Sequence, residues 1–182
     1  MPLHETKKAT MADWEALGED VRAELIDGEI HNMAPPNRKH QKILMFLSAE
    51  INAYLRGKSC EVYPAPFGVY LHNDDGTTDA VEPDISVICD KDKLSNRGCE
   101  GAPTWIIEIV SPGNMVHDYV TKLGLYLRHG VKEYWIVNPE REAVTVYQLN
   151  NDLLPRTYTF RDMIQVHTLA NLCIDFMQLN LE

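Results

Sequence analysis

Two carboxylate residues, Asp84 and Glu108, lie within apolar, β-branched stretches that are typical of buried strands. Burying an unpaired charge is costly, so such a stretch carries a carboxylate only where a partner offsets the charge. A hard divalent cation, held by carboxylates and a backbone carbonyl, is the simplest partner. Lys122 follows on a predicted helix, where an ammonium group can orient water or stabilise charge developing on phosphorus. Together these residues predict metal-dependent hydrolysis of a phosphodiester.

Three predicted elements must bring these side chains together. Strands are expected at residues 84–89 and 105–110, and the two carboxylates converge only if these strands are neighbours. A helix is predicted at residues 114–129, with Lys122 on its second or third turn. That helix must fold back over the sheet for the ammonium group to enter the site.

The remaining chain alternates between strands and helices. A hairpin is predicted at residues 23–33, because Asp27-Gly28 between short apolar runs is a strong signal for a two-residue turn. A long helix is predicted at residues 38–56, and residues 61–71 are expected to form one edge or bent strand that contains two prolines. Further strands are expected at residues 134–137 and 143–149 and near Tyr158 and Val166, with a polar loop at residues 90–103. A short helix is expected to start after an N-cap at Thr10 and to run through Trp14 to Leu17, and a last helical turn is expected after Asp175. This order predicts a single α/β domain over residues 1–182, a mixed β-sheet flanked by helices with an N-terminal β-hairpin.

The composition is ordinary for a globular protein, with 182 residues of which 45% are hydrophobic and 24% charged. The longest apolar runs are too short for a membrane span, and the N-terminus lacks an apolar signal region. There are four cysteines without a CxxC pair, at positions Cys60, Cys89, Cys99 and Cys173. These features favour a reduced cytoplasm and no membrane association.

Charge is unevenly distributed along the sequence. The formal net charge of −10 argues against indiscriminate nucleic-acid binding. Residues 36–60, however, hold five basic residues and one acid, whereas residues 61–118 hold eleven acids and three bases. A basic helix beside an acidic pocket suits a nuclease, so Arg38, Lys39 and Lys42 are candidate nucleic-acid contacts. A solvated helix face explains the same basic residues equally well.

The pattern around the two carboxylates resembles that of the PD-(D/E)XK nuclease superfamily. Pro83-Asp84 corresponds to the first element of the motif, and Glu108 corresponds to its second acid. Val110 occupies the position two residues after Glu108, where the motif has lysine. Some branches of the superfamily carry this lysine on the next helix, where Lys122 is suitably placed.

The wider sequence, from about residue 11 to 180, resembles the bacterial Uma-type restriction endonuclease family, long catalogued as a domain of unknown function. The matching stretches are residues 23–29, 34–36 with His40, 82–86, 90–101, 107–112, 118–126 and 130–139. The resemblance implies a restriction-endonuclease-like fold, a Mg²⁺ or Mn²⁺ cofactor, and Asp84, Glu108 and Lys122 as the catalytic set. We expect Asp84 and Glu108 to hold the cation, with the Ile109 backbone carbonyl as a third ligand.

Glu24 and His40 lie in matching stretches near the N-terminus. In this superfamily an early acid often completes the metal site or positions water, which makes Glu24 a candidate. His40, near the start of the long helix, is a candidate contact to a phosphate or to the water shell of the metal. The alternatives are a surface carboxylate on the hairpin for Glu24, and for His40 a polar residue at a helix terminus.

The three central residues also have structural alternatives. Asp84 can cap a turn after the preceding proline. Glu108 can be neutralised by a buried arginine, and Lys122 can be a solvated helix residue paired with Asp118 four positions earlier.

Other residues whose side chains could take part in chemistry are expected to have structural roles. Trp105, Tyr126 and Trp135 are expected in the core rather than as stacking platforms. The remaining histidines lack the spacing of zinc ligands and are His4, His31, His72, His117, His129 and His167.

The sequence therefore predicts a metal-dependent endonuclease acting on DNA, with Glu24 and His40 assisting. A homodimer is expected, because a duplex has two strands to cut. The alternative is a non-catalytic nucleic-acid-binding or regulatory protein that keeps the fold and its pocket, which the negative net charge favours.

Overall fold

Two mixed β-sheets form the framework of the molecule, which a computed structural model describes for residues 8–18, 20–111 and 117–181. The larger sheet has the strand order β11 (Asp152–Thr159), β10 (Ala143–Gln148), β9 (Glu133–Asn138), β8 (Trp105–Ile109), β6 (Ile85–Ile88) and β3 (Glu61–Pro64). The smaller sheet has the order β2 (Glu29–Asn32), β1 (Ala23–Ile26), β5 (Thr78–Val81), β4 (Gly68–His72) and β7 (Gly98–Glu100). Only the pairs β8–β9 and β4–β7 are parallel within these two sheets of the described chain. The predicted α/β fold with a mixed sheet and an N-terminal hairpin is confirmed, although the strands form two mixed sheets and a separate two-stranded sheet.

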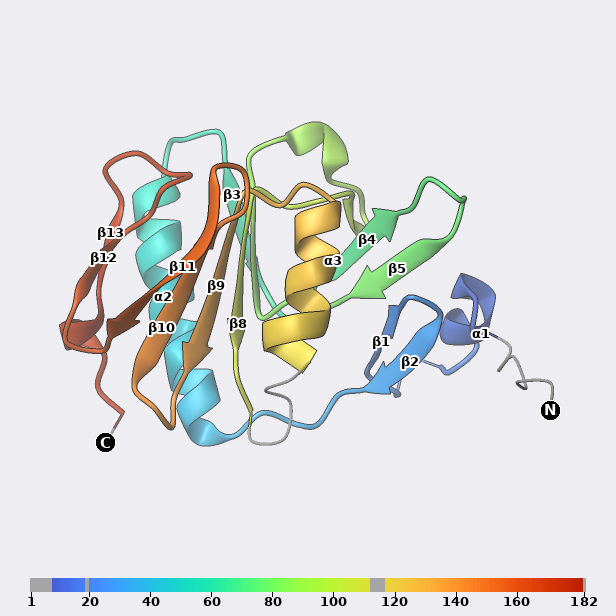
Figure 1. The fold of residues 1–182 in the computed structure, drawn as a ribbon, viewed down its shortest axis with the longest axis horizontal. Helices are drawn as coiled ribbons and strands as arrows, with labels where there is room; N and C mark the ends of the chain where they lie inside the picture. Colours follow the sequence, from blue (N-terminus) through green and yellow to red (C-terminus); the bar gives the residue numbers. More distant parts are fainter. Residues whose placement is uncertain (1–7, 19, 112–116, 182) are drawn as a thin grey trace.

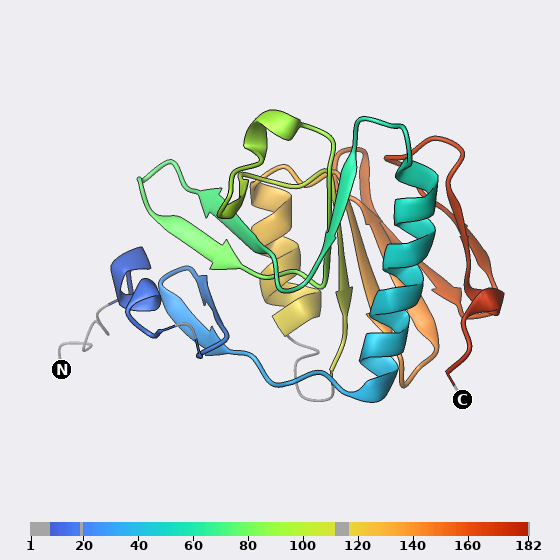
Figure 2. The same ribbon diagram turned by 180° about the vertical axis from the view of Figure 1, so that it is seen from behind.

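Helices cover both faces of the larger sheet. The long helix α2 (Arg38–Leu55) lies against one face, and α3 (Leu123–Arg128) lies against the other, on the side of the smaller sheet (Figure 1 and Figure 2). The short elements are α1 (Met11–Glu15), η1 (Lys91–Lys93), the π-helical turn η2 (His117–Lys122), η3 (Phe176–Gln178), and the two-stranded pair β12 (Met163–Gln165) and β13 (Cys173–Asp175). The α1 helix and the β12–β13 pair lie at opposite ends of the molecule (Figure 1).

Side chains of β8 alternate between the two helix-covered faces. Trp105 and Ile107 belong to the core on the α2 side, whereas Ile106 and Val110 belong to the core that includes Leu125 of α3. Because alternate residues of a strand point to the same face, Glu108 shares the α3 side with Ile106. Val110, at the position of the motif lysine, is a buried core residue.

The β1–β2 hairpin follows its predicted turn closely. Asp27 and Gly28 both have positive φ angles, 52° and 79°, which is the backbone of a type I′ turn. This turn fixes the register so that Glu24 lies directly opposite His31. Cross-strand partners project from the same face, so the hairpin presents an acid and an imidazole together.

Several local predictions were wrong in detail. Residues 61–71 form two strands, β3 and β4, that belong to different sheets and are separated at a cis Ala65-Pro66 bond. The loop at residues 90–103 contains η1 and β7, and β5 was not predicted. Strand β7 pairs with β4, which is distant in sequence, whereas β5 forms a hairpin with β4 and also pairs with the distant strand β1. Of the helix predicted at residues 114–129, residues 114–116 lie outside the described chain, and the rest begins as the π-helical turn η2.

A disulfide joins Cys60 and Cys89, which flank the paired strands β3 and β6. The cysteine spacing did not indicate this bond, and such bonds are rare in the reduced cytoplasm that the sequence predicts. No helix within residues 8–18, 20–111 and 117–181 combines the length and apolar character needed to cross a membrane.

Candidate active site

Asp84 and Glu108 lie side by side where strands β6 and β8 meet. These strands are antiparallel neighbours, and Ile85 pairs with Ile107. The Asp84 N–H points to Glu108 Oε2 at 3.4 Å, and the Ile109 N–H donates to Asp84 Oδ2 at 2.7 Å. The Ile109 N–H, next to Glu108, therefore orients the Asp84 carboxylate, and the Asp84 N–H faces the Glu108 carboxylate.

Lys122 enters the same site from η2. Its Nζ atom lies 2.9 Å from Glu108 Oε1 and 3.0 Å from Glu24 Oε1, with Asp118 Oδ1 at 4.0 Å. The lysine side chain is only 5% exposed, which is incompatible with a solvated helix residue. The Asp118 side chain is buried beside it, as a helix-face partner of Lys122.

Among the described residues, the buried Glu108 carboxylate pairs with a lysine and a tyrosine and with no arginine. Its Oε1 atom accepts hydrogen bonds from Lys122 Nζ and from Tyr126 Oη, the latter at 2.8 Å. Tyr126 follows Lys122 by four residues, so both donors lie on the same helical face. One oxygen of Glu108 therefore accepts hydrogen bonds from a charged donor, the Lys122 ammonium, and from a neutral donor, the Tyr126 hydroxyl.

Glu24 and His40 approach the centre from opposite sides. Glu24 on β1 is buried, and its Oε1 atom also accepts the Glu82 N–H at 3.0 Å. His40 lies in the first turn of α2, where its backbone N–H donates to the capping Asn37. Its Nε2 atom lies 3.0 Å from Asp84 Oδ1. Glu24 is therefore not a surface carboxylate of the hairpin, whereas His40 does lie at a helix terminus and also contacts Asp84.

These side chains line a pocket of about 410 Å³. Its walls come from β1, β2, the start of α2, β8 and η2, and they include Arg22, His31, Gln41 and His117. Arg38, Lys39 and Lys42 do not line the described part of this pocket, although they belong to the same first turns of α2. Lys39 forms an ion pair with Glu140 at 3.6 Å. The role of these three residues as nucleic-acid contacts stays a prediction.

Burial and mutual charge shift the pKa values of the site. Burial raises the pKa of Glu108 well above its usual value, Lys122 opposes this shift, and Asp84 adds to it. Burial likewise raises the pKa of Asp118 to about 6. For Glu24 the effect of burial is outweighed by the Lys122 ammonium and by hydrogen bonds, which lower its pKa to about 2. Burial lowers the pKa of Lys122, but Glu108, Glu24 and Asp118 together raise it well above its usual value.

The donor set fits a hard divalent cation. Asp84 and Glu108 offer carboxylate oxygens to the pocket, which Ile109 also lines, and the role of the Ile109 carbonyl as a third ligand stays a prediction. Among the described residues, no group of three or more His, Cys, Asp or Glu side chains is arranged to hold a metal ion. Two carboxylates and a carbonyl leave several coordination positions to water, which suits Mg²⁺ better than a metal that requires a closed protein cage.

Sequence reasoning missed three residues that contact this constellation. Tyr126 lies in the core, as predicted, but its hydrogen bond to Glu108 was not predicted, although its spacing of four residues from Lys122 indicates such a contact. His31 was set aside for lack of zinc-ligand spacing, yet the two-residue turn places it opposite Glu24. His117 lies 3.5 Å from Glu24, and nothing in its local sequence indicated this contact.

The class of protein follows from the match between this chain and a known family. Residues 9–177 match the Uma2 family, which is described as "Putative restriction endonuclease". The chain belongs to this family, in agreement with the resemblance found in the sequence.

Two individual proteins illustrate the relationship. An uncharacterized protein from Synechocystis sp. is 26% identical over 130 residues, which cover 71% of this chain and 67% of that protein. The crystal structure of a putative nuclease belonging to DUF820, from Anabaena variabilis, has a TM-score of 0.76 and 22% identity, covering 93% of this chain and 96% of the other. At that level of identity the similarity establishes the fold.

Proposed function

We propose that the protein is a metal-dependent endonuclease that hydrolyses phosphodiester bonds in DNA. The observation that carries this proposal is the convergence of Asp84, Glu108 and Lys122 in one pocket. A lysine ammonium lies against the same carboxylate that would bind the cation, although the motif position holds an apolar valine. Membership of a family described as a restriction endonuclease supports the same reaction.

Asp84, Glu108 and the Ile109 carbonyl would hold Mg²⁺ or Mn²⁺. When bound, such a cation supplies positive charge to the phosphoryl oxygens and makes water more acidic. Burial and the neighbouring acids raise the pKa of Glu108 although Lys122 opposes them, and a bound divalent cation would further favour its anionic form.

Lys122 would position the nucleophilic water and stabilise negative charge on the phosphate. Its high pKa, sustained by Glu108, Glu24 and Asp118 against the effect of burial, keeps the ammonium charged at neutral pH. A charged lysine is a donor and not a base, so its role is orientation and electrostatic stabilisation.

Two flanking residues would hold this set in place. Glu24 restrains Lys122 through the contact of 3.0 Å, and His40 restrains Asp84 through Nε2 at 3.0 Å. Arg38, Lys39 and Lys42 would contact the nucleic-acid backbone outside the pocket. We expect a homodimer, since cleavage of a duplex requires two cuts, and a cytoplasmic protein.

Incubation of supercoiled plasmid with Mn²⁺ tests the proposal. Wild type should nick the plasmid, and Glu108→Ala should lower the rate roughly a thousandfold by removing a ligand and a lysine partner. Glu50→Ala, which changes an exposed glutamate of α2, is the matched control and should cleave at the wild-type rate. Equal nicking by wild type and Glu108→Ala would refute the mechanism. No cleavage of duplex DNA, single-stranded DNA or RNA by wild type would favour the non-catalytic alternative.

A further inference from the structure

Two histidines, His31 and His117, form a ring pair beside the Glu24 carboxylate. Their ring centroids are 4.6 Å apart, with planes tilted by 41°. His117 Nε2 lies 3.5 Å from Glu24 Oε2, within ion-pair range but without the geometry of a hydrogen bond. Both rings line the pocket that contains Lys122. Neither histidine has a role in the proposed chemistry.

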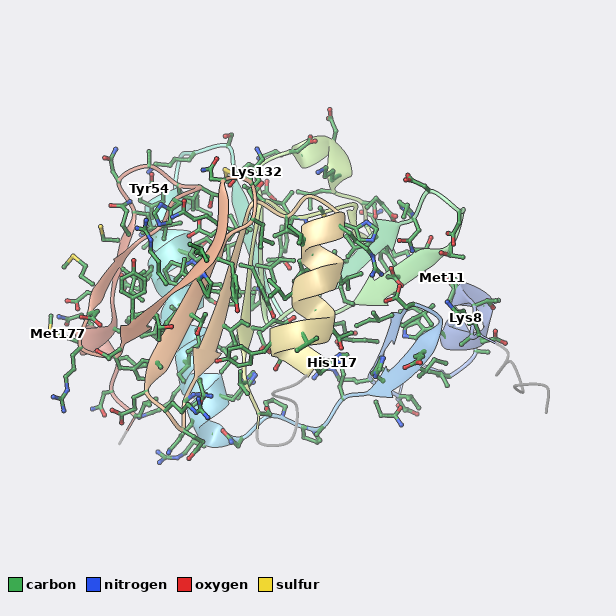
Figure 3. The ribbon with its side chains drawn as sticks, in the orientation of Figure 1. Lys8, Met11, Tyr54, His117, Lys132 and Met177 are labelled. Atoms are coloured by element: carbon green, nitrogen blue, oxygen red, sulfur yellow. A yellow bond between two sulfur atoms is a disulfide. The ribbon has the colours of Figure 1, made fainter. Side chains whose placement is uncertain are left out.

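The pair is built by elements that also carry the central residues. The register of the β1–β2 hairpin places His31 opposite Glu24. His117 begins the π-helical turn that ends at Lys122. Figure 3 labels His117 at the end of this helical segment that lies nearest β1 and β2. The contact between the His31 and His117 rings therefore joins the hairpin that carries Glu24 to the helical turn that carries Lys122. This contact is separate from the direct ion pair between Glu24 and Lys122.

Exposure increases from the centre of the site to the ring pair. The side chains of Lys122 and Glu24 are 5% and 3% exposed, whereas those of His117 and His31 are 19% and 33% exposed. The two rings thus form an outer layer over the lysine–glutamate pair. Loss of a ring would admit water to this contact, and water weakens an ion pair by raising the local dielectric constant.

The two oxygens of Glu24 have separate partners. Oε1 receives Lys122 Nζ and the Glu82 N–H, both at 3.0 Å, and Oε2 faces His117. A carboxylate held at one oxygen can still rotate about its side-chain bonds, which would displace the ammonium group. The imidazole at Oε2 and the ring behind it oppose this rotation.

We propose that His117 is a positioning residue that acts on Lys122 through Glu24, with His31 bracing its ring. The kinetic consequence of this arrangement rests on the proposed function, because a displaced ammonium slows cleavage only if Lys122 takes part in it. Misplacement of a reacting group by about 1 Å can lower a rate by about a hundredfold.

Steady-state cleavage kinetics test the kinetic part. His117→Ala should lower kcat by about ten- to a hundredfold with little change in KM, and His117→Gln, whose side chain still places a polar N–H group toward Glu24 Oε2, should recover most of the loss. His31→Ala should give a smaller loss. His72→Gln, an exposed histidine that pairs with Glu100, is the matched control and should retain the wild-type kcat. Full activity of His117→Ala would overturn the proposal.

A double-mutant cycle separates positioning from a general loss of stability. If His117 acts through Glu24, His117→Ala should cost little once Glu24→Gln is present, because the connection is already broken. Additive losses in the double variant would contradict action through Glu24.

Acetylation of Lys122 by a succinimidyl ester, followed by mass spectrometry, measures how accessible the lysine is. This measurement does not depend on cleavage of a nucleic acid. His117→Ala should raise the labelling rate of Lys122 over that of wild type, because water and reagent then reach the ammonium group, and His117→Gln should raise it less. Unchanged labelling would overturn the proposal even if a substrate is cleaved. A raised rate in a protein that cleaves no nucleic acid would support the positioning and overturn the proposed function.

Discussion

Lys122 Nζ lies 2.9 Å from Glu108 Oε1, although the lysine belongs to a helical turn and the glutamate to a central strand. Val110, two residues after Glu108, faces the core instead. The helical segment after β8 therefore supplies the ammonium group that the strand lacks. This relationship is the basis of the functional proposal, and it makes the exact length and charge of residue 122 critical.

Replacement of Lys122 by methionine keeps its volume and removes its charge. We expect Lys122→Met to lower the single-turnover cleavage rate roughly a thousandfold, because the negative charge on the phosphate loses its cationic partner. Lys122→Arg should restore little, since a planar guanidinium does not replace a compact ammonium between Glu24 and Glu108. Recovery of near-wild-type rates by Lys122→Arg would show that charge alone suffices at this position.

Asp118 makes stability depend on pH. Burial raises its pKa from 3.8 to about 6 in the folded protein, so the folded state binds this proton more tightly than the unfolded chain. Ionisation of Asp118 therefore lowers stability as pH rises from about 4 through 6. Asp118→Asn removes the effect and should be more stable than wild type by of the order of 2 kcal/mol at pH 8, with the difference vanishing near pH 4. Chemical denaturation at both pH values measures this, and an equal difference at both would refute the assignment.

Part of this site could be predicted from the sequence, because some local sequence patterns are compatible with only a few structures. A carboxylate in an apolar strand requires a partner, which singled out Glu108. The Asp27-Gly28 turn sets the hairpin register, which places Glu24 on the same face as His31. The capping Asn37 fixes the start of α2, and with it the position of His40.

The rest depends on contacts between residues that are distant in sequence. The contact of His117 with Glu24 arises because η2 packs against the hairpin, and no local pattern encodes that packing. The short strand β7 pairs with the distant strand β4, and the short strand β5 pairs with the distant strand β1. The cysteines that form the disulfide become neighbours only when β3 pairs with β6. The single-domain organisation and the compartment stay predictions.

Glu133 connects β9 to the C-terminal segment and provides a test of stability away from the pocket. Its buried carboxylate accepts hydrogen bonds from the backbone N–H groups of His167 and Thr168, from Thr168 Oγ1, and from Trp135 Nε1. Glu133→Ala should lower the free energy of unfolding by about 3 kcal/mol, because several buried donors lose their acceptor. Thr168→Ser, which keeps the hydroxyl, is the control. Below the unfolding transition the cleavage rate of Glu133→Ala should equal that of wild type; a selective loss of activity would place this residue in the mechanism.

The Cys60–Cys89 bond links residues separated by 29 positions. Opening it with a reductant, or removing it with Cys60→Ser, should lower the free energy of unfolding by about 3 kcal/mol. Cys173→Ser changes an exposed free thiol and should leave stability unchanged. If reductant shifts the unfolding of Cys60→Ser as much as that of wild type, the stabilisation comes from another source.

The central claim is that Asp84 and Glu108 bind one divalent cation, and crystals soaked in Mn²⁺ test it most directly. Anomalous diffraction should reveal a manganese peak within about 2.2 Å of an oxygen of each carboxylate, the usual length of such bonds. The peak should disappear in Glu108→Ala and persist in His72→Gln. A wild-type crystal with no peak between the two carboxylates at millimolar Mn²⁺ would contradict the account.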